Sequence, residues 1–403
     1  MRIGLTTPRA TIQDGFGMWQ ETVRGIAERE PFVLILAFLF GLAVGSFLNV
    51  VIYRVPRRLS VVRPGSHCPR CGASIRPRDN IPLLSFLLLK GRCRACRQPI
   101  SWLYPAIEFG TGLMFVLLLQ RHGWGWGLIP DAVFVSALIA LAVIDAQHRL
   151  LPDAITYPGF VLAVGLRALL PDFGEMRDVG SDSSRGVPPF LSEHALGAGA
   201  LLIAMSSILL LLLERVDYRL VGRALDEEAR AGEDTSAIAA SECVAPNGEG
   251  RSNGREAIQR SIRDVERKES WSPEWAALLL AMGLSAIFVL HGLRDPSFAL
   301  VGTLSALHAL GGAALGSGVL WLSRLGYYAV RRLEGVGFGD VKMMLMVGAF
   351  LGWTGTLVTI FLASLLGSIY GVTLMLLTRE RNPKLPFGSF LSLAALVVLL
   401  FLP

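Results

Sequence analysis

The chain has 403 residues, of which 52% are hydrophobic and 17% are charged. This composition excludes an ordinary soluble domain, in which about a quarter of the residues carry charge. Several apolar runs reach the roughly 20 residues that cross a bilayer as a helix. The net charge of +6 is modest, and basic loops on one side of a membrane account for it without a nucleic-acid partner. The sequence predicts an all-α polytopic membrane protein.

About ten apolar segments follow a polar N-terminal stretch that lacks the features of a cleavable signal peptide. The stretch from 54 to 101 is strongly basic, which places it in the cytoplasm and the N-terminus outside. Three short apolar segments near 341–353, 356–377 and 388–402 close the chain, after a basic linker from Arg324 to Arg332. The expected divisions are a polar segment 1–30, a first membrane helix 31–53, a four-cysteine domain 54–101, helices 102–170, an insertion 171–297 with two helices and a cytoplasmic loop 214–272, and helices 298–403.

Four of the five cysteines form two Cys-x-x-Cys pairs, about twenty residues apart. Such pairs can place four thiolates around one zinc ion, and four protein ligands leave no open position for catalysis. We therefore expect a structural zinc site in a reducing compartment. Unconnected thiols and a redox role are the alternatives. The expected ligands are Cys68, Cys71, Cys93 and Cys96.

Two isolated acids lie at the ends of apolar segments. Asp145 follows the run 141–144, and Asp340 follows Gly337 and Gly339, which permit a tight turn and a close approach of another chain. Counting crossings puts both acids at the cytoplasmic face. Two carboxyl groups that share a site hold one proton between them, which suits acid–base chemistry. The alternatives are helix-end residues at the headgroup level and the proton-relay groups of a membrane transporter.

Two further polar residues accompany these acids. Asp153 stands at the expected start of the next helix, where an Asp caps exposed N–H groups and suits the helix dipole. Lys342 follows Asp340 by two positions. It either biases the acids electrostatically or extends toward the interface.

At this point the chain resembles a known family, the bacterial type IV prepilin peptidases, which are leader peptidases and N-methyltransferases. The residues that carry the resemblance are distributed over most of the chain. They are the opening helix at 41–56, the four-cysteine stretch with the run 79–85, Ile144 and Asp145 with Leu151-Pro152-Asp153, the Gly-Phe-Gly-Asp motif at 337–340, and Pro386-Phe387-Gly388. The Gly-x-Gly-Asp motif is also similar to that of presenilin-type membrane proteases.

The resemblance implies an aspartyl endopeptidase of the bacterial inner membrane. Asp145 and Asp340 would cut prepilins and type II secretion pseudopilins at the cytoplasmic face. S-adenosylmethionine would then supply a methyl group to the new N-terminus. A departure from the family is the long stretch between the aspartates. The sequence leaves open which pilins are cut, which Asp acts as the base, where the methyl donor binds, what the insertion does, and the oligomeric state.

Overall fold

A computed structural model describes residues 31–170, 195–206, 273–332, 335–378 and 385–402, together with positions 208 and 215 and apart from positions 64, 124, 126 and 295. The predicted segment 1–30, the loop 171–194 and most of the loop 214–272 lie outside these residues. The described chain is helical, and its only β-structure is two isolated bridges, His67 with Ser74 and Arg92 with Pro99. The all-α prediction is confirmed.

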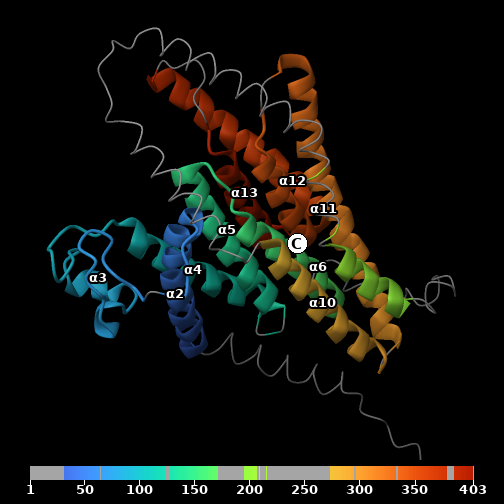
Figure 1. The fold of residues 1–403 in the computed structure, drawn as a ribbon, viewed down its shortest axis with the longest axis horizontal. Helices are drawn as coiled ribbons and strands as arrows, with labels where there is room; N and C mark the ends of the chain where they lie inside the picture. The colour runs from blue at the N-terminus through green and yellow to red at the C-terminus, as the bar shows by residue number, and fades with distance from the viewer. Residues whose placement is uncertain are drawn as a thin grey trace, which may run out of the picture.

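The long helices pack as a bundle, with the four-cysteine segment at one side (Figure 1). This segment contains only two 3₁₀ turns and the short helix α3. Residues 195–206 form one more helix of the bundle. The long helices are α2 (Pro31–Arg54), α4 (Leu103–His122), α5 (Leu128–His148), α6 (Asp153–Leu169), α10 (Pro273–Gly292), α11 (Pro296–Arg331), α12 (Phe338–Thr378) and α13 (Phe387–Phe401); the short helix α3 covers Leu84–Leu88.

Five helices in the described ranges are long and apolar enough to cross a membrane: α2, α4, α5, α11 and α12. Helix α12 has 41 residues, about twice the length that a bilayer requires. It is broken at Gly352, whose φ is 71° and ψ −174°. Gly316 contacts Met344 before the break and Thr356 after it. The chain therefore reverses at Gly352, and the two halves of α12 both pack on α11; the break lies between the predicted segments 341–353 and 356–377.

The break in α12 depends on a glycine. A positive φ with an extended ψ is accessible essentially to glycine alone, and it costs another residue about 1–3 kcal/mol. A Cβ at this position would also lie 2.7 Å from Cε1 of His308. Gly352→Ala is expected to lower the thermal unfolding temperature in detergent by several degrees. Gly311→Ala is the control, because a Cβ there meets nothing within 4 Å; equal effects of both changes would contradict this role.

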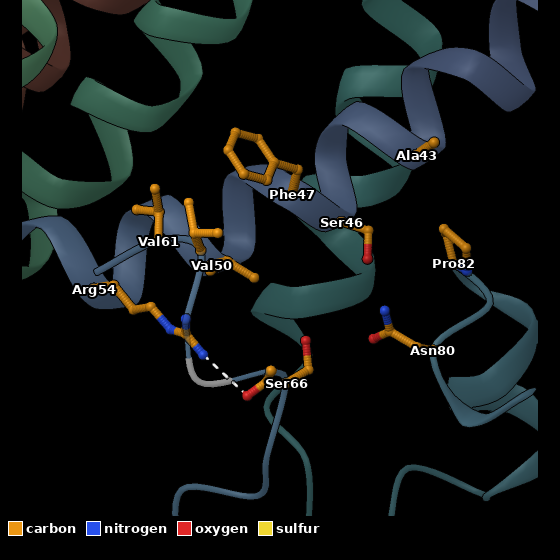
Figure 2. Close-up of a pocket in the computed structure, with 11 residues that line it drawn as sticks. Ala43, Ser46, Phe47, Val50, Arg54, Val61, Ser66, Asn80 and Pro82 are labelled. Atoms are coloured by element: carbon orange, nitrogen blue, oxygen red, sulfur yellow. Dashed lines mark hydrogen bonds between the residues drawn. The ribbon is translucent and has the colours of Figure 1, made fainter. Parts of the chain in front are cut away.

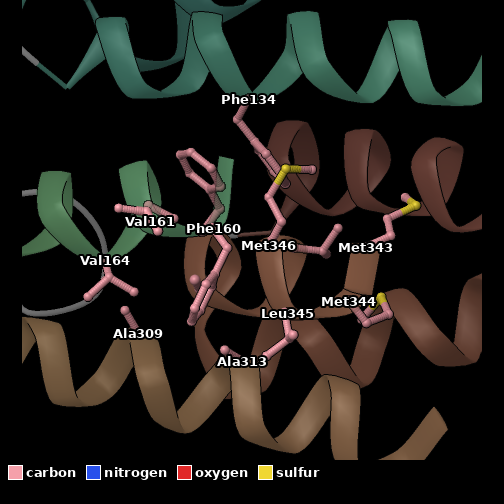
Figure 3. Close-up of a cluster of buried hydrophobic side chains, with 14 of the residues drawn as sticks. Phe134, Phe160, Val161, Val164, Ala309, Ala313, Met343, Met344, Leu345 and Met346 are labelled. Atoms are coloured by element: carbon pink, nitrogen blue, oxygen red, sulfur yellow. The ribbon is translucent and has the colours of Figure 1, made fainter. Parts of the chain in front are cut away.

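The interior of the bundle is built from α5, α6, α10, α11, α12 and α13, with a smaller contribution from the helix at 195–206. Phe134 of α5 stacks on Phe350 of α12, with ring centroids 4.3 Å apart. Figure 3 shows the methionines of α12 between the aromatic side chains of α5 and α6 and the small alanines of α11. The run 343–347 is fully enclosed by these helices. The first half of α12 is thus the central element, and it positions its own N-terminus.

Helix α11 is longer than the sequence predicts. The stretch from Arg324 to Arg331 continues the helix and is not a linker. Arg324 is 3% exposed, and its Nη1 donates to the carbonyl oxygen of Val336 at 2.7 Å. The density of basic residues led to the prediction of a loop in this stretch. In the structure the stretch is helical, and one of these residues, Arg324, points inward and binds the loop that follows.

Candidate active site and metal centre

Asp145 lies in the last turn of α5 and is 5% exposed. Its Oδ2 accepts a hydrogen bond from the Ser389 backbone N–H at 2.7 Å. The Ser389 hydroxyl lies 3.0 Å from the same Oδ2 and 2.9 Å from the carbonyl oxygen of Ala142, and both acceptors compete for its single proton. Ser389 belongs to the first turn of α13, where backbone N–H groups lack the regular helical partner, and its N–H also lies 3.2 Å from the carbonyl oxygen of Pro386. The N-terminus of α13 therefore fixes one oxygen of the Asp145 carboxyl group.

The residue before Ser389 brings α13 this close. A Cβ on Gly388 would lie 3.1 Å from Oδ2 of Asp145 and 2.9 Å from Cδ1 of Leu151. Any side chain at 388 would therefore push the N-terminus of α13 away from α5. The Pro-Phe-Gly motif that the sequence analysis identified thus belongs to the wall of the Asp145 site.

Asp340 lies in the first turn of α12 and is 8% exposed. Its backbone N–H donates to the carbonyl oxygen of Gly337 at 3.1 Å. Arg324 holds the preceding loop through Val336, and its guanidinium carbon lies 5.9 Å from the ring centre of Phe338. A carboxylate in the first turn of a helix is favoured by the helix dipole. The end of α11 thus fixes the turn that presents Asp340.

The glycines of the Gly-Phe-Gly-Asp motif provide space and not an unusual backbone conformation. Neither Gly337 nor Gly339 has a positive φ, so the turn does not use a conformation reserved for glycine. A Cβ on Gly339 would lie 3.2 Å from Cβ of Leu151. Leu151 also contacts Gly388, which borders Asp145. The two aspartates therefore lie at the same end of the bundle, around Leu151; we call this region the aspartate end.

Lys342 and Asp153 form an ion pair in this region. The Nζ atom lies 3.1 and 3.2 Å from the two carboxylate oxygens of Asp153, and 4.9 Å from the ring centres of Tyr157 and Phe338. Asp153 begins α6 and lies in its first turn, where an acid suits the helix dipole as expected, while the N-cap position itself is occupied by Pro152. Lys342 is 7% exposed and points into the protein. The pair joins α6 to α12 and holds the segment that contains Leu151.

The four predicted metal ligands come together. The Sγ atoms of Cys68, Cys71, Cys93 and Cys96 all lie within 4.8 Å of one another. Each pair opens a turn of the same design: Gly72 and Arg97 have φ values of 69° and 58°, and their N–H groups donate to the carbonyl oxygens of Cys68 and Cys93. Two equivalent turns facing one another supply four soft ligands that could hold one metal ion.

The thiols differ in their acidity. Backbone N–H groups of Cys71 and Arg70 lower the pKa of Cys68 to about 6, whereas burial and the neighbouring thiols raise the pKa of Cys96 to about 11; a metal ion binds the thiolate form. Nearby, Arg94 lowers the pKa of the Asp79 carboxyl group by donating two hydrogen bonds, at 2.6 and 2.9 Å. This ion pair connects the second cysteine turn to the segment before α3.

Sequence reasoning missed three functional features. Ser389 gave no signal, because its role depends on α13 meeting α5 end to end. Arg324 was assigned to a linker. Asp131, a further acid in α5, is 1% exposed and lies about 20 Å from Asp145 along the helix. The charge of Arg167 acts on it, and Arg167 donates to the carbonyl oxygen of Phe350 at 2.5 Å. This network belongs to the end opposite the aspartates.

The Ser389 hydroxyl can be tested separately from its backbone. Ser389→Ala keeps the N–H donor and removes one hydrogen bond to Asp145. Losing a bond to a charged group typically costs about 1.5–3 kcal/mol, so kcat for any reaction at Asp145 is expected to fall roughly tenfold or more, with little change in KM. Ser392→Ala is the control, because this hydroxyl donates to the carbonyl oxygen of Gly388. A full loss of folded protein in Ser389→Ala would contradict a role confined to Asp145.

Comparisons with known proteins agree with this arrangement. The model of the bacterial peptidase A24 N-terminal domain matches residues 39–122, and that of the type IV leader peptidase family matches residues 132–220 and 274–372. The chain belongs to the type IV prepilin leader peptidase/N-methyltransferase family. The interruption of the second match falls on the predicted loop, and the helices at 195–206 and α10 lie within matched residues. The family match therefore does not support two added helices.

Individual members of the family are similar to this chain over parts or most of its length. The prepilin leader peptidase/N-methyltransferase of Myxococcus xanthus is 51% identical over 34% of this chain, and that of Neisseria gonorrhoeae is 40% identical over 32%. These alignments span 41% and 53% of those relatives, about half their length. The enzyme of Aeromonas salmonicida is 26% identical over 91% of this chain and 90% of its own. No solved structure matches the chain.

Proposed function

We propose that this member of the family is an aspartyl endopeptidase that removes the leader of type IV prepilins and type II secretion pseudopilins. The observation that carries the proposal is the meeting of α5, α12 and α13 around Leu151, which places Asp145 and Asp340 at one end of the bundle. Both acids are almost fully buried. Buried acids in membrane segments are costly, and they mark functional sites.

The chemistry follows from two carboxyl groups that share one proton. The ionised carboxylate accepts a proton from a water molecule as its oxygen attacks the scissile carbonyl carbon. The protonated carboxyl donates a hydrogen bond to the carbonyl oxygen, and the leaving amine takes up a proton as the C–N bond breaks. Ser389 keeps the Asp145 carboxyl group in one orientation throughout. No step requires a metal ion, so the cysteine site is structural.

The proposal extends to location and to a second activity. The basic segment that carries the cysteines belongs in the cytoplasm by the positive-inside rule, so the aspartate end faces the cytoplasmic side of the bacterial inner membrane. Leaders would be cut there as the substrate lies in the bilayer. The relatives are named as N-methyltransferases, which supports methylation of the new N-terminus with S-adenosylmethionine as the donor.

The test is cleavage of a model prepilin by the purified chain in detergent, followed by mass spectrometry of both fragments. A peptidase releases the leader as a single fragment and leaves one new N-terminus. Reconstitution in liposomes with a pH-sensitive dye tests the rival transporter. Proton flux that depends on the aspartates, without any cleavage, would overturn the proposed function.

A further inference from the structure

The short helix α3 turns its apolar side outward. Its residues Leu84, Leu87 and Leu88 are 47%, 66% and 71% exposed. Their spacing of three and four positions from Leu84 puts them on one face of the helix, which we call the leucine face. Ser85 is buried instead, and its hydroxyl donates to the carbonyl oxygen of Arg78 at 3.2 Å. A surface helix in water has the opposite arrangement, so the leucine face indicates an apolar environment.

A hydrogen bond fixes the depth of α3 relative to the membrane. The backbone N–H of Leu83, the residue before α3, donates to Oε2 of Glu108 at 2.8 Å. Glu108 is the sixth residue of α4, which is one of the helices long and apolar enough to cross a membrane. A helix rises 1.5 Å per residue, so Glu108 lies about 8 Å inside the start of that span. Interfacial helices lie at this depth, about 5–10 Å into the boundary of headgroups and acyl chains.

A tryptophan joins α3 to the same border. Trp102 directly precedes α4 and is 75% exposed. Its ring meets the ring of Phe86 in α3 edge on, with centroids 4.7 Å apart. Tryptophan is enriched at the membrane–water interface. On the other side, Asn80 and Pro82 of the loop before α3 lie opposite Ser46 of α2 (Figure 2). The leucine face is therefore held beside two helices that can cross the membrane.

The charge of the segment suits an anionic membrane surface. Residues 54–101 contain eleven arginines and lysines but one acid, Asp79, and Asp79 pairs with Arg94 at 2.6 Å. Arg78 and Lys90 flank α3 on its two sides in the sequence, and both are exposed. Basic residues at the membrane surface attract anionic lipid headgroups. Positive charge beside an outward apolar face is the pattern of an element that lies in the interface.

We propose that the leucine face and Trp102 dock the four-cysteine segment onto the cytoplasmic leaflet, with Arg78 and Lys90 on anionic lipid headgroups. The segment buries almost none of its own side chains, so the lipid surface supplies the apolar contact that it lacks. The inference goes beyond the proposed function and uses only the placement of α4 as a membrane span. It does not involve the aspartates.

The test places the photo-reactive residue benzoylphenylalanine at position 88 of the full chain, in nanodiscs of equal parts phosphatidylglycerol and phosphatidylcholine. Irradiation should attach lipid at position 88 severalfold more often than at Ala95, an exposed position in the second cysteine turn that serves as the control. Mass spectrometry should find phosphatidylglycerol enriched among the adducts above its share in the bilayer. Arg78→Gln/Lys90→Gln should remove this enrichment. The probe at Leu87 gives an independent measurement, and zinc content reports folding.

Each outcome decides the inference. Lipid adducts at 88 and 87 that are no more frequent than at 95 would overturn the docking. Adducts without enrichment of phosphatidylglycerol would overturn the headgroup contact. Attachment to a second copy, or to another segment of the same chain, would show that protein covers the leucine face. Attachment that requires an added prepilin would make the face a substrate-binding surface. None of these measurements uses leader cleavage, so the inference and the peptidase proposal can fail separately.

Discussion

Replacing either Asp145 or Asp340 by Asn is expected to reduce leader cleavage by at least about 100-fold, the lower limit of what general acid–base catalysis contributes. The amide has nearly the same shape as the carboxyl group but cannot exchange a proton at neutral pH. Because one proton is shared between the two acids, loss of either partner removes the reaction path, and the double variant should be no worse than each single one. The measurement is the single-turnover cleavage rate of a model prepilin in detergent.

Two controls make this result specific. Asp153→Asn removes a third acid of the same region that pairs with Lys342, and because it only supports the site it should lower the cleavage rate far less than either active-site change. Zinc content and unfolding temperature should match the wild type in both active-site variants. Normal cleavage by Asp145→Asn and by Asp340→Asn would show that the acids only mark the membrane boundary.

Removing the metal ligands is expected to unfold the four-cysteine segment. Between residues 55 and 102, Ser85 is the only described residue that is buried, so this segment has almost no hydrophobic core of its own. Structural zinc sites contribute about 10–16 kcal/mol of apparent binding free energy at pH 7, which becomes folding free energy. The variant Cys68→Ser/Cys96→Ser should lose its zinc, and amide exchange in residues 67–100 should rise to that of an unfolded chain.

The same experiment separates the two regions of the protein. Amides of α5, α12 and α13 should keep their protection, because their packing around Leu151 does not involve the cysteines. Cys243→Ser, which changes the fifth cysteine of the sequence, outside both Cys-x-x-Cys pairs, is the control and should retain one zinc per chain. Stoichiometric zinc in the double variant, measured by elemental mass spectrometry, would contradict the assignment.

The sequence by itself determined the helical membrane class, the four cysteines as one cluster and the position of each aspartate at a helix end. These features are local. Twenty apolar residues dictate a helix in a bilayer, and Cys-x-x-Cys spacing dictates a turn that presents two thiols. The reversal within α12 was also readable, because Gly352 divides an apolar stretch too long for one crossing.

The tertiary structure alone decided which side chains support the aspartates. Ser389 reaches Asp145 across 244 positions of sequence, and Lys342 reaches Asp153 across 189. Such contacts depend on how helices pack end to end, and hydrophobic periodicity specifies only which face is buried. Asp153 looks like a cap and Arg324 like a linker residue for the same reason. The sequence reveals that a charged side chain lies in an apolar segment, where its burial costs free energy. Only the tertiary structure determines which partner offsets this free-energy cost.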